Sequence, residues 1–98
     1  MKRDIITSAT IFKQWCSRLR PVFALDTETT SLNYLDLEII GWSICDGKQA
    51  CYVDLLWPHV DRYKLLRILD YYIGEAEMVV FHNAPFDMMV LYKEGIIV

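Results

Sequence analysis

The chain has 98 residues, of which 54% are hydrophobic and 13% aromatic, and its formal net charge is −3. This length allows one small domain, and no apolar run approaches the roughly 20 residues of a membrane span. The acidic balance gives no basic footprint for nucleic acid, although bound cations would supply positive charge where phosphate sits.

The first predicted element is an amphipathic helix. Thr7 or Ser8 is a suitable N-cap, and apolar residues at helical spacing continue to about Leu19. Arg20-Pro21 ends the helix, because the residue before proline disfavours helical backbone. We expect this helix to pack on the core and to carry no chemistry.

The stretch at 22–28 predicts a functional strand. It opens with four apolar residues without alternation, which is typical of a strand buried on both faces. Asp26 and Glu28 follow two positions apart, so both side chains leave the same face. No Lys or Arg lies between Val22 and Leu37. The two carboxylates are therefore either solvated at a polar turn or bound to a divalent cation, which prefers oxygen ligands.

A β-hairpin is predicted next. The apolar-rich runs 38–45 and 49–55 flank Asp46-Gly47-Lys48, and Asp-Gly between two such runs is a strong hairpin signal. Together with the strand at 22–28, they predict an antiparallel three-stranded meander.

The three cysteines, Cys16, Cys45 and Cys51, form no CxxC pair and are odd in number. We interpret them as ordinary thiols in a reducing, intracellular compartment such as the cytoplasm. The N-terminus shows no signal peptide.

A helical crossover leads to a fourth strand. A helix is predicted from Asp61 to about Ile73, with Gly74 as its stop. The short apolar run 78–81 then indicates a buried strand. Because a helix precedes it, we expect it to lie parallel to the strand at 22–28.

The last predicted helix runs from Pro85 to about Glu94, with Gly95 at its end. Pro85 at the first helical position puts Ala84 at the cap and Asp87 in the first turn. The helix dipole favours a carboxylate there, and such an acid is common without any function. Ile96-Ile97-Val98 indicates the start of another buried element.

The acids of the strand at 22–28 and the acid of the last helix are expected to lie close together. Parallel strands end at the same edge of a sheet, so Asp87 is expected near Asp26 and Glu28, at an edge where open α/β sheets place ligands. Three acids without a basic neighbour predict a shared divalent-cation site. His82, at the end of an apolar strand, is predicted to be a satisfied core histidine without a metal role.

Two motifs carry a resemblance to a known family. The stretch from Asp26 to Leu32, DTETTSL, is similar to the first motif of the DEDD 3′–5′ exonucleases, and HNAPFD, from His82 to Asp87, is similar to the second. Their order and the meander between them also fit. The residues after Asp87 are most similar to the proofreading domains of family A DNA polymerases.

The resemblance implies a ribonuclease H-like α/β fold, with a mixed sheet of an antiparallel three-stranded meander plus a parallel strand, and flanking helices. It implies a 3′–5′ exonuclease that hydrolyses terminal phosphodiester bonds of single-stranded DNA, with RNA as the other candidate substrate, and that proofreads beside a polymerase domain. Two divalent cations, Mg²⁺ or Mn²⁺, would serve the reaction, and no membrane is involved.

Carried over residue by residue, the resemblance implies that Asp26, Glu28 and Asp87 are catalytic and ligate the two cations, with Asp26 bridging them. It also implies four substrate-binding positions: Thr27, Leu32, Asn83 and Phe86.

The chain departs from the family in one respect. The third motif, Tyr or His followed four positions later by Asp, does not follow Asp87, which is the last Asp in the chain. The resemblance therefore implies that residues 1–98 are the N-terminal part of a single exonuclease domain, incomplete at its C-terminus and inactive alone. Surface around 96–98 would then favour self-association.

Three alternatives remain open. The chain is also compatible with an RNA-processing or free-standing exonuclease of the same superfamily. A second alternative is a non-catalytic module that binds nucleic acid or protein. An endonuclease or integrase on the same fold fits less well, because the Asn-x-x-Phe-Asp arrangement favours an exonuclease.

Overall fold

A computed structural model describes residues 2–31, 33 and 35–98. The elements follow one another along the chain as β1 (Lys2–Ile6), α1 (Ala9–Cys16), β2 (Val22–Thr29), β3 (Ile39–Cys45), β4 (Gln49–Asp54), α2 (Arg62–Glu75), β5 (Met78–Phe81) and α3 (Ala84–Lys93). No helix in this described part is long and apolar enough to cross a bilayer.

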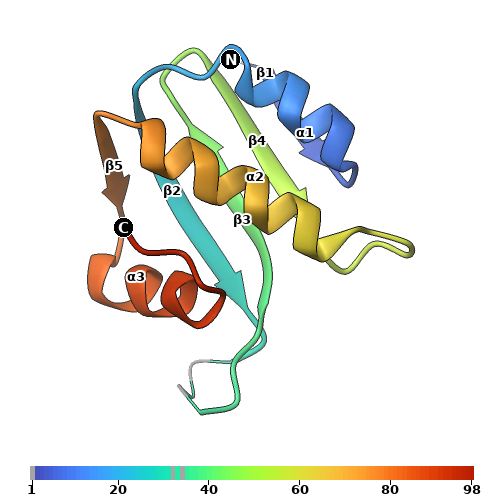
Figure 1. The fold of residues 1–98 in the computed structure, drawn as a ribbon, viewed down its shortest axis with the longest axis vertical. Coiled ribbons are helices and arrows are strands. Elements are labelled where there is room, and N and C mark those ends of the chain that lie inside the picture. Colours follow the sequence, from blue (N-terminus) through green and yellow to red (C-terminus); the bar gives the residue numbers. More distant parts are fainter. Residues whose placement is uncertain (1, 32, 34) are drawn as a thin grey trace.

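In the residues that the structure describes, five strands form one mixed sheet in the order β1-β4-β3-β2-β5 (Figure 1). Strands β2, β3 and β4 are antiparallel neighbours, and β5 runs parallel to β2. The predicted meander and the parallel fourth strand are confirmed. Strand β1, which was not predicted, pairs in parallel with β4. Its charged residues Lys2, Arg3 and Asp4 mask any apolar pattern, which is typical of an edge strand.

One hydrophobic core joins the sheet to the helices. Strand β2 contributes Phe23 and Leu25, and the buried residues of the three helices pack in the same cluster. Helix α2 crosses the sheet on the side that also carries α1 (Figure 1). The helix residues in this core are Phe12, Trp15 and Cys16 from α1, Leu65, Leu66, Leu69 and Ile73 from α2, and Val90 and Leu91 from α3.

The opposite side of the sheet is solvent-exposed, and we call it the open face. Along β2, Phe23, Leu25 and Thr27 are buried, and the residues between them are exposed. The prediction that 22–28 is buried on both faces is therefore wrong, because the helices that pack on this sheet cover one side of it. Strand β5 was also predicted to be buried, but it is an edge strand, with Met78 58% and Val80 48% exposed.

Helices α1 and α2 both end at residues other than those predicted. Helix α2 begins after Asp61, whose carboxylate accepts from Lys64 N–H, but it continues through Gly74 to Glu75. Gly74 does not adopt the left-handed backbone that makes glycine a stop signal. Helix α1 begins after Ser8, as predicted, and ends at Cys16, three residues before the predicted end.

Helix α3 is found where it was predicted, but it begins at Ala84 and ends at Lys93, each one residue earlier than expected. Asn83, rather than Ala84, is the N-cap. Gly95 has a φ of 81°, its N–H donates to the Tyr92 carbonyl, and Ile96 N–H donates to the Leu91 carbonyl. This Schellman geometry turns Ile96 into the core, where it is fully buried. The prediction of exposed apolar surface at 96–98 is therefore wrong for Ile96, whereas Ile97 is 77% exposed.

Candidate active site

Asp87 is anchored to strand β2 by Thr27. Its Oδ1 accepts hydrogen bonds from the Thr27 hydroxyl at 2.6 Å and from the Thr27 backbone N–H at 3.2 Å. Its Oδ2 accepts from the Asn83 N–H at 3.3 Å. Strand β5 ends at Phe81, opposite Leu25, so Thr27 lies beyond the last β5 residue and its N–H is available to Asp87. Asp87 is only 1% exposed, and these three bonds satisfy its buried carboxylate.

Asp26 and Glu28 project from β2 onto the open face, where both are exposed, as the strand alternation predicts. Across the ladder they lie opposite Ser43 and Gly41 of β3. The pairing shifts register directly after Glu28, which marks a β-bulge. Such bulges bend a strand and change the direction of its side chains. Two carboxylates therefore stand together at the end of an irregular strand.

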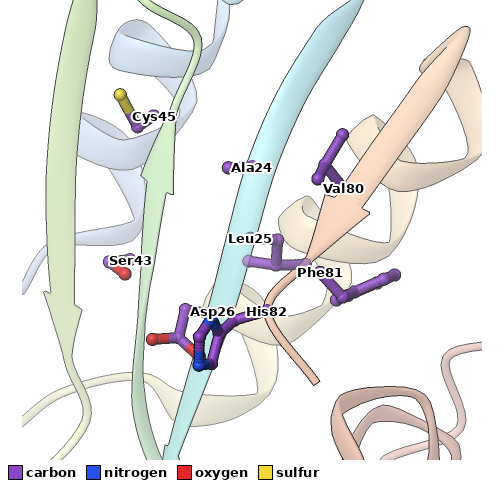
Figure 2. Close-up of a pocket in the computed structure, with 8 residues that line it drawn as sticks. All are labelled: Ala24, Leu25, Asp26, Ser43, Cys45, Val80, Phe81 and His82. Atoms are coloured by element: carbon purple, nitrogen blue, oxygen red, sulfur yellow. The ribbon is translucent and has the colours of Figure 1, made fainter. Parts of the chain in front are cut away.

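A hollow of about 410 Å³ lies beside Asp26. Figure 2 shows its lining: Ala24, Leu25 and Asp26 from β2, Ser43 and Cys45 from β3, and Val80, Phe81 and His82 from β5 and the turn after it. His82 is exposed, so the prediction of a core histidine is wrong: the residue follows an edge strand. Apolar walls with a few polar groups are typical of ligand sites.

Ser43 and His82 were not predicted as site residues. The hairpin turn fixes the register of β3 against β4, but the nine-residue connection before β3 leaves its register against β2 undetermined from sequence. Ser43 could therefore not be placed beside Asp26. His82 was discounted because the run before it was interpreted as a buried strand.

The structure brings Asp87 to the end of β2, as predicted, but its carboxylate bonds to Thr27, a core-side residue. Asp26 and Glu28 point to the other side. Within the described residues, no three His, Cys, Asp or Glu side chains are grouped so that they could hold a metal ion. Asp26 and Glu28 do offer exposed oxygen ligands of the kind that Mg²⁺ and Mn²⁺ take. A cation shared by all three acids stays a prediction.

The predicted substrate-binding residues differ in their surroundings. Thr27 is 7% exposed and its hydroxyl is engaged by Asp87. Asn83 is exposed at the start of α3, and its side chain makes no capping hydrogen bond to the helix. Phe86 is half-buried and packs against the core. Leu32 lies outside the described residues. Contact of these residues with substrate stays a prediction.

The two buried thiols belong to the core. Burial raises the pKa of Cys16 above its ordinary range and that of Cys51 to about 12, so both stay protonated and unreactive at neutral pH.

Comparisons with known proteins agree with the two motifs. A family model described as 3′–5′ exonuclease matches residues 4–98. DNA polymerase I of Chloroflexus aurantiacus is 35% identical over 99 aligned positions, which cover 94% of this chain and 10% of that protein. The chain thus spans about a tenth of the length of this relative.

A solved structure supports the fold. The EXO domain of Nibbler from Aedes aegypti superposes with a TM-score of 0.70 over 98% of this chain and 47% of that one, at 9% sequence identity. At this identity the likeness concerns the fold alone, and it confirms the predicted ribonuclease H-like architecture. The family model extends over nearly the whole chain, and the chain therefore belongs to the DEDD family of 3′–5′ exonucleases.

Proposed function

We propose that this chain is a metal-dependent 3′–5′ exonuclease domain that acts on the 3′ end of single-stranded DNA and proofreads beside a polymerase domain. One observation carries the proposal. Asp26 and Glu28 stand exposed on the open face, and Asp26 lines a hollow together with His82 and Ser43, in a chain that matches the family along its length. The DNA polymerase I relative supports the choice of DNA over RNA.

Asp26 and Glu28 would hold two divalent cations, Mg²⁺ or Mn²⁺, with Asp87 as the third acid at the end of β2. When bound, such cations stabilise negative charge on a phosphodiester and lower the pKa of an attacking water. Thr27 fixes Asp87 in place through two hydrogen bonds. The acids on the open face also repel phosphate, so nucleic acid approaches this surface only after cations have neutralised it.

The hollow suits the terminal nucleotide. Ala24 and Val80 give it apolar walls, and the Ser43 hydroxyl and the His82 ring supply polar groups close to Asp26 (Figure 2). A base or sugar resting on the apolar walls would place its phosphate toward the acids. Asn83, exposed at the start of α3, would contact the same nucleotide.

We further propose that the 98 residues have little nuclease activity by themselves. They offer three predicted catalytic carboxylates, those of Asp26, Glu28 and Asp87, and no Tyr-x-x-x-Asp or His-x-x-x-Asp pair after Asp87 to position water. Catalytic groups that act as a unit fail together, so each missing group costs orders of magnitude in rate.

The test measures binding of a single-stranded oligodeoxynucleotide that carries a fluorescent label at its 5′ end. Fluorescence anisotropy reports the binding, in Mn²⁺ or in EDTA. We expect Mn²⁺-dependent binding, which Asp26→Asn abolishes and a 3′-terminal phosphate weakens. Equal binding in EDTA would contradict the proposal. An RNA of the same sequence serves as the competitor, and tighter binding of RNA would assign the substrate differently. Gel analysis of the same samples measures cleavage, and robust 3′ degradation would overturn the proposed inactivity.

A further inference from the structure

The ladder places two rows of side chains across the open face. The first row pairs Glu28 of β2 with Gly41 of β3, and Gly41 with Asp54 of β4. The second row pairs Asp26 with Ser43, and Ser43 with Tyr52. Paired residues of neighbouring strands point to the same side of a sheet. Tyr52 and Asp54 therefore share the face of the two predicted metal ligands.

Tyr52 lies across Gly41 rather than straight out from the sheet. A Cβ atom on Gly41 would lie 2.6 Å from the ring carbon Cζ of Tyr52 and still closer to its hydroxyl oxygen. No side chain other than hydrogen fits under the ring. Because Gly41 is the cross-strand partner of Glu28, a phenol that crosses Gly41 reaches toward the Glu28 side of the face.

The surroundings of the Tyr52 hydroxyl favour its role as a donor. A neutral phenol has one hydroxyl hydrogen to donate, and Asp54 and Glu28 are the two acids that share this part of the open face. Of these two acids, Asp54 already accepts the Leu56 N–H through Oδ1 at 2.9 Å, in the turn after β4. Glu28 is exposed at the end of β2.

We propose that Tyr52 is a positioning residue for Glu28: its hydroxyl reaches over Gly41, donates a hydrogen bond to one oxygen of the Glu28 carboxylate, and leaves the other oxygen directed at a divalent cation. A glutamate side chain has three rotatable bonds, and fixing it in one orientation before the cation arrives removes an entropy cost from binding. This inference rests on the metal-dependent function proposed above, and it adds a residue outside both sequence motifs.

The contact itself is tested without metal by NMR. All six tyrosines are labelled with ¹³C at Cζ, whose chemical shift responds to hydrogen bonding of the hydroxyl, and Tyr52→Phe assigns the Tyr52 signal by its loss. We expect Glu28→Gln to move the Tyr52 signal more than any other, whereas Asp54→Asn moves it less. An unmoved signal in Glu28→Gln, or a larger response to Asp54→Asn, would overturn the inference.

The consequence is tested by Mn²⁺ affinity, measured by calorimetry on the whole chain. Tyr52→Phe keeps the ring over Gly41 and removes only the hydroxyl, so the fold is retained, and we expect Mn²⁺ to bind about 3- to 10-fold more weakly. Tyr63→Phe, which changes a tyrosine that is 73% exposed on α2, is the matched control and should leave affinity unchanged.

The outcomes separate the two proposals. If Glu28→Gln abolishes Mn²⁺ binding and Tyr52→Phe leaves it unchanged, the positioning role is overturned and the metal-dependent function stands. If neither substitution affects Mn²⁺, both are overturned, because no cation binds at Glu28. Weaker binding in Tyr52→Phe together with the NMR response supports the inference.

Discussion

The hydroxyl of Thr27 and the carboxylate of Asp87 lie 2.6 Å apart, although 60 residues separate them in the chain. This bond joins the C-terminal end of β2 to the first turn of α3 and connects the first acidic motif to the second. It also explains how an acid can be buried there, because the hydroxyl and backbone N–H of Thr27, together with the Asn83 N–H, satisfy the carboxylate.

The first prediction concerns this bond. Thr27→Val keeps the shape of the side chain and removes its hydroxyl, which leaves the buried Asp87 carboxylate with one donor fewer. We expect a loss of about 1–3 kcal/mol in the free energy of unfolding, measured by urea denaturation. Thr29→Val, which removes an exposed bond to the Ser31 carbonyl, is the control and should change stability by less than about 0.5 kcal/mol. Equal losses in the two variants would contradict the account.

The second prediction concerns acid stability at the hairpin turn. Asp46 is 9% exposed, and its carboxylate accepts backbone N–H bonds from Lys48 at 2.9 Å, Gln49 at 3.0 Å and Arg20 at 3.1 Å. Partial burial opposes its ionisation, but these bonds outweigh that effect and lower the pKa of Asp46. A lowered pKa in the folded state gives stability that is complete above the unfolded pKa of about 4 and disappears as pH falls through the folded pKa.

Asp46→Asn should therefore lower stability at neutral pH and flatten the part of the pH–stability profile that lies below about pH 4. The measurement is urea denaturation at a series of pH values. Asp70→Asn is a matched control, because the Asp70 carboxylate is partly exposed and its ion pair with Arg67, at 3.5 Å, involves no backbone N–H group. If both variants give the same profile, the hydrogen bonds of Asp46 do not stabilise the turn.

Much of the fold could be predicted from local patterns. Asp46-Gly47 indicated the β3–β4 hairpin, and the helix before Met78 indicated a parallel strand. Alternation placed Asp26 and Glu28 on one side of β2. Each of these features depends on residues close together in the chain, or on a rule about chain direction.

The rest depends on tertiary structure. An apolar run such as 22–25 does not show whether one or both sides of the strand will be covered, and here one side is open. Strand β1 gains its conformation from pairing with β4. The five residues of β1 include three charged ones, and their sequence does not indicate this pairing. The bond of Asp87 to Thr27 and the position of Tyr52 over Gly41 depend on the register between distant strands.

The third prediction concerns the edge of the sheet. Met78 and Val80 of β5 are exposed on the open face beside Val22, and within the described residues the outer edge of β5 pairs with no other strand. Exposed apolar edge strands favour pairing with another copy. We expect the purified chain to self-associate with increasing concentration in sedimentation experiments, and Val80→Lys to reduce this. A monomer at all concentrations would show that the exposed edge does not pair.

The fourth prediction concerns the two acids without metal. Asp26 and Glu28 carry like charges on one face, so removal of one charge relieves repulsion. Asp26→Asn should raise the melting temperature in EDTA by about 1–3 °C, because the pair is exposed and the effect is small. Glu38→Gln, which removes an acid before β3, should not raise it. An unchanged or lower melting temperature in Asp26→Asn would show that the two carboxylates do not interact.

The most direct test of the central claim is calorimetric titration of the chain with Mn²⁺, in parallel with Asp26→Asn, Glu28→Gln and the control Asp70→Asn. The account predicts that the unmodified chain and the control bind Mn²⁺ alike and gain thermal stability from it, since a ligand that binds the folded state stabilises it. Substitution of either acid on the open face should abolish both effects. Equal Mn²⁺ binding in all four proteins, or none in the unmodified chain, would contradict the assignment of Asp26 and Glu28 as metal ligands.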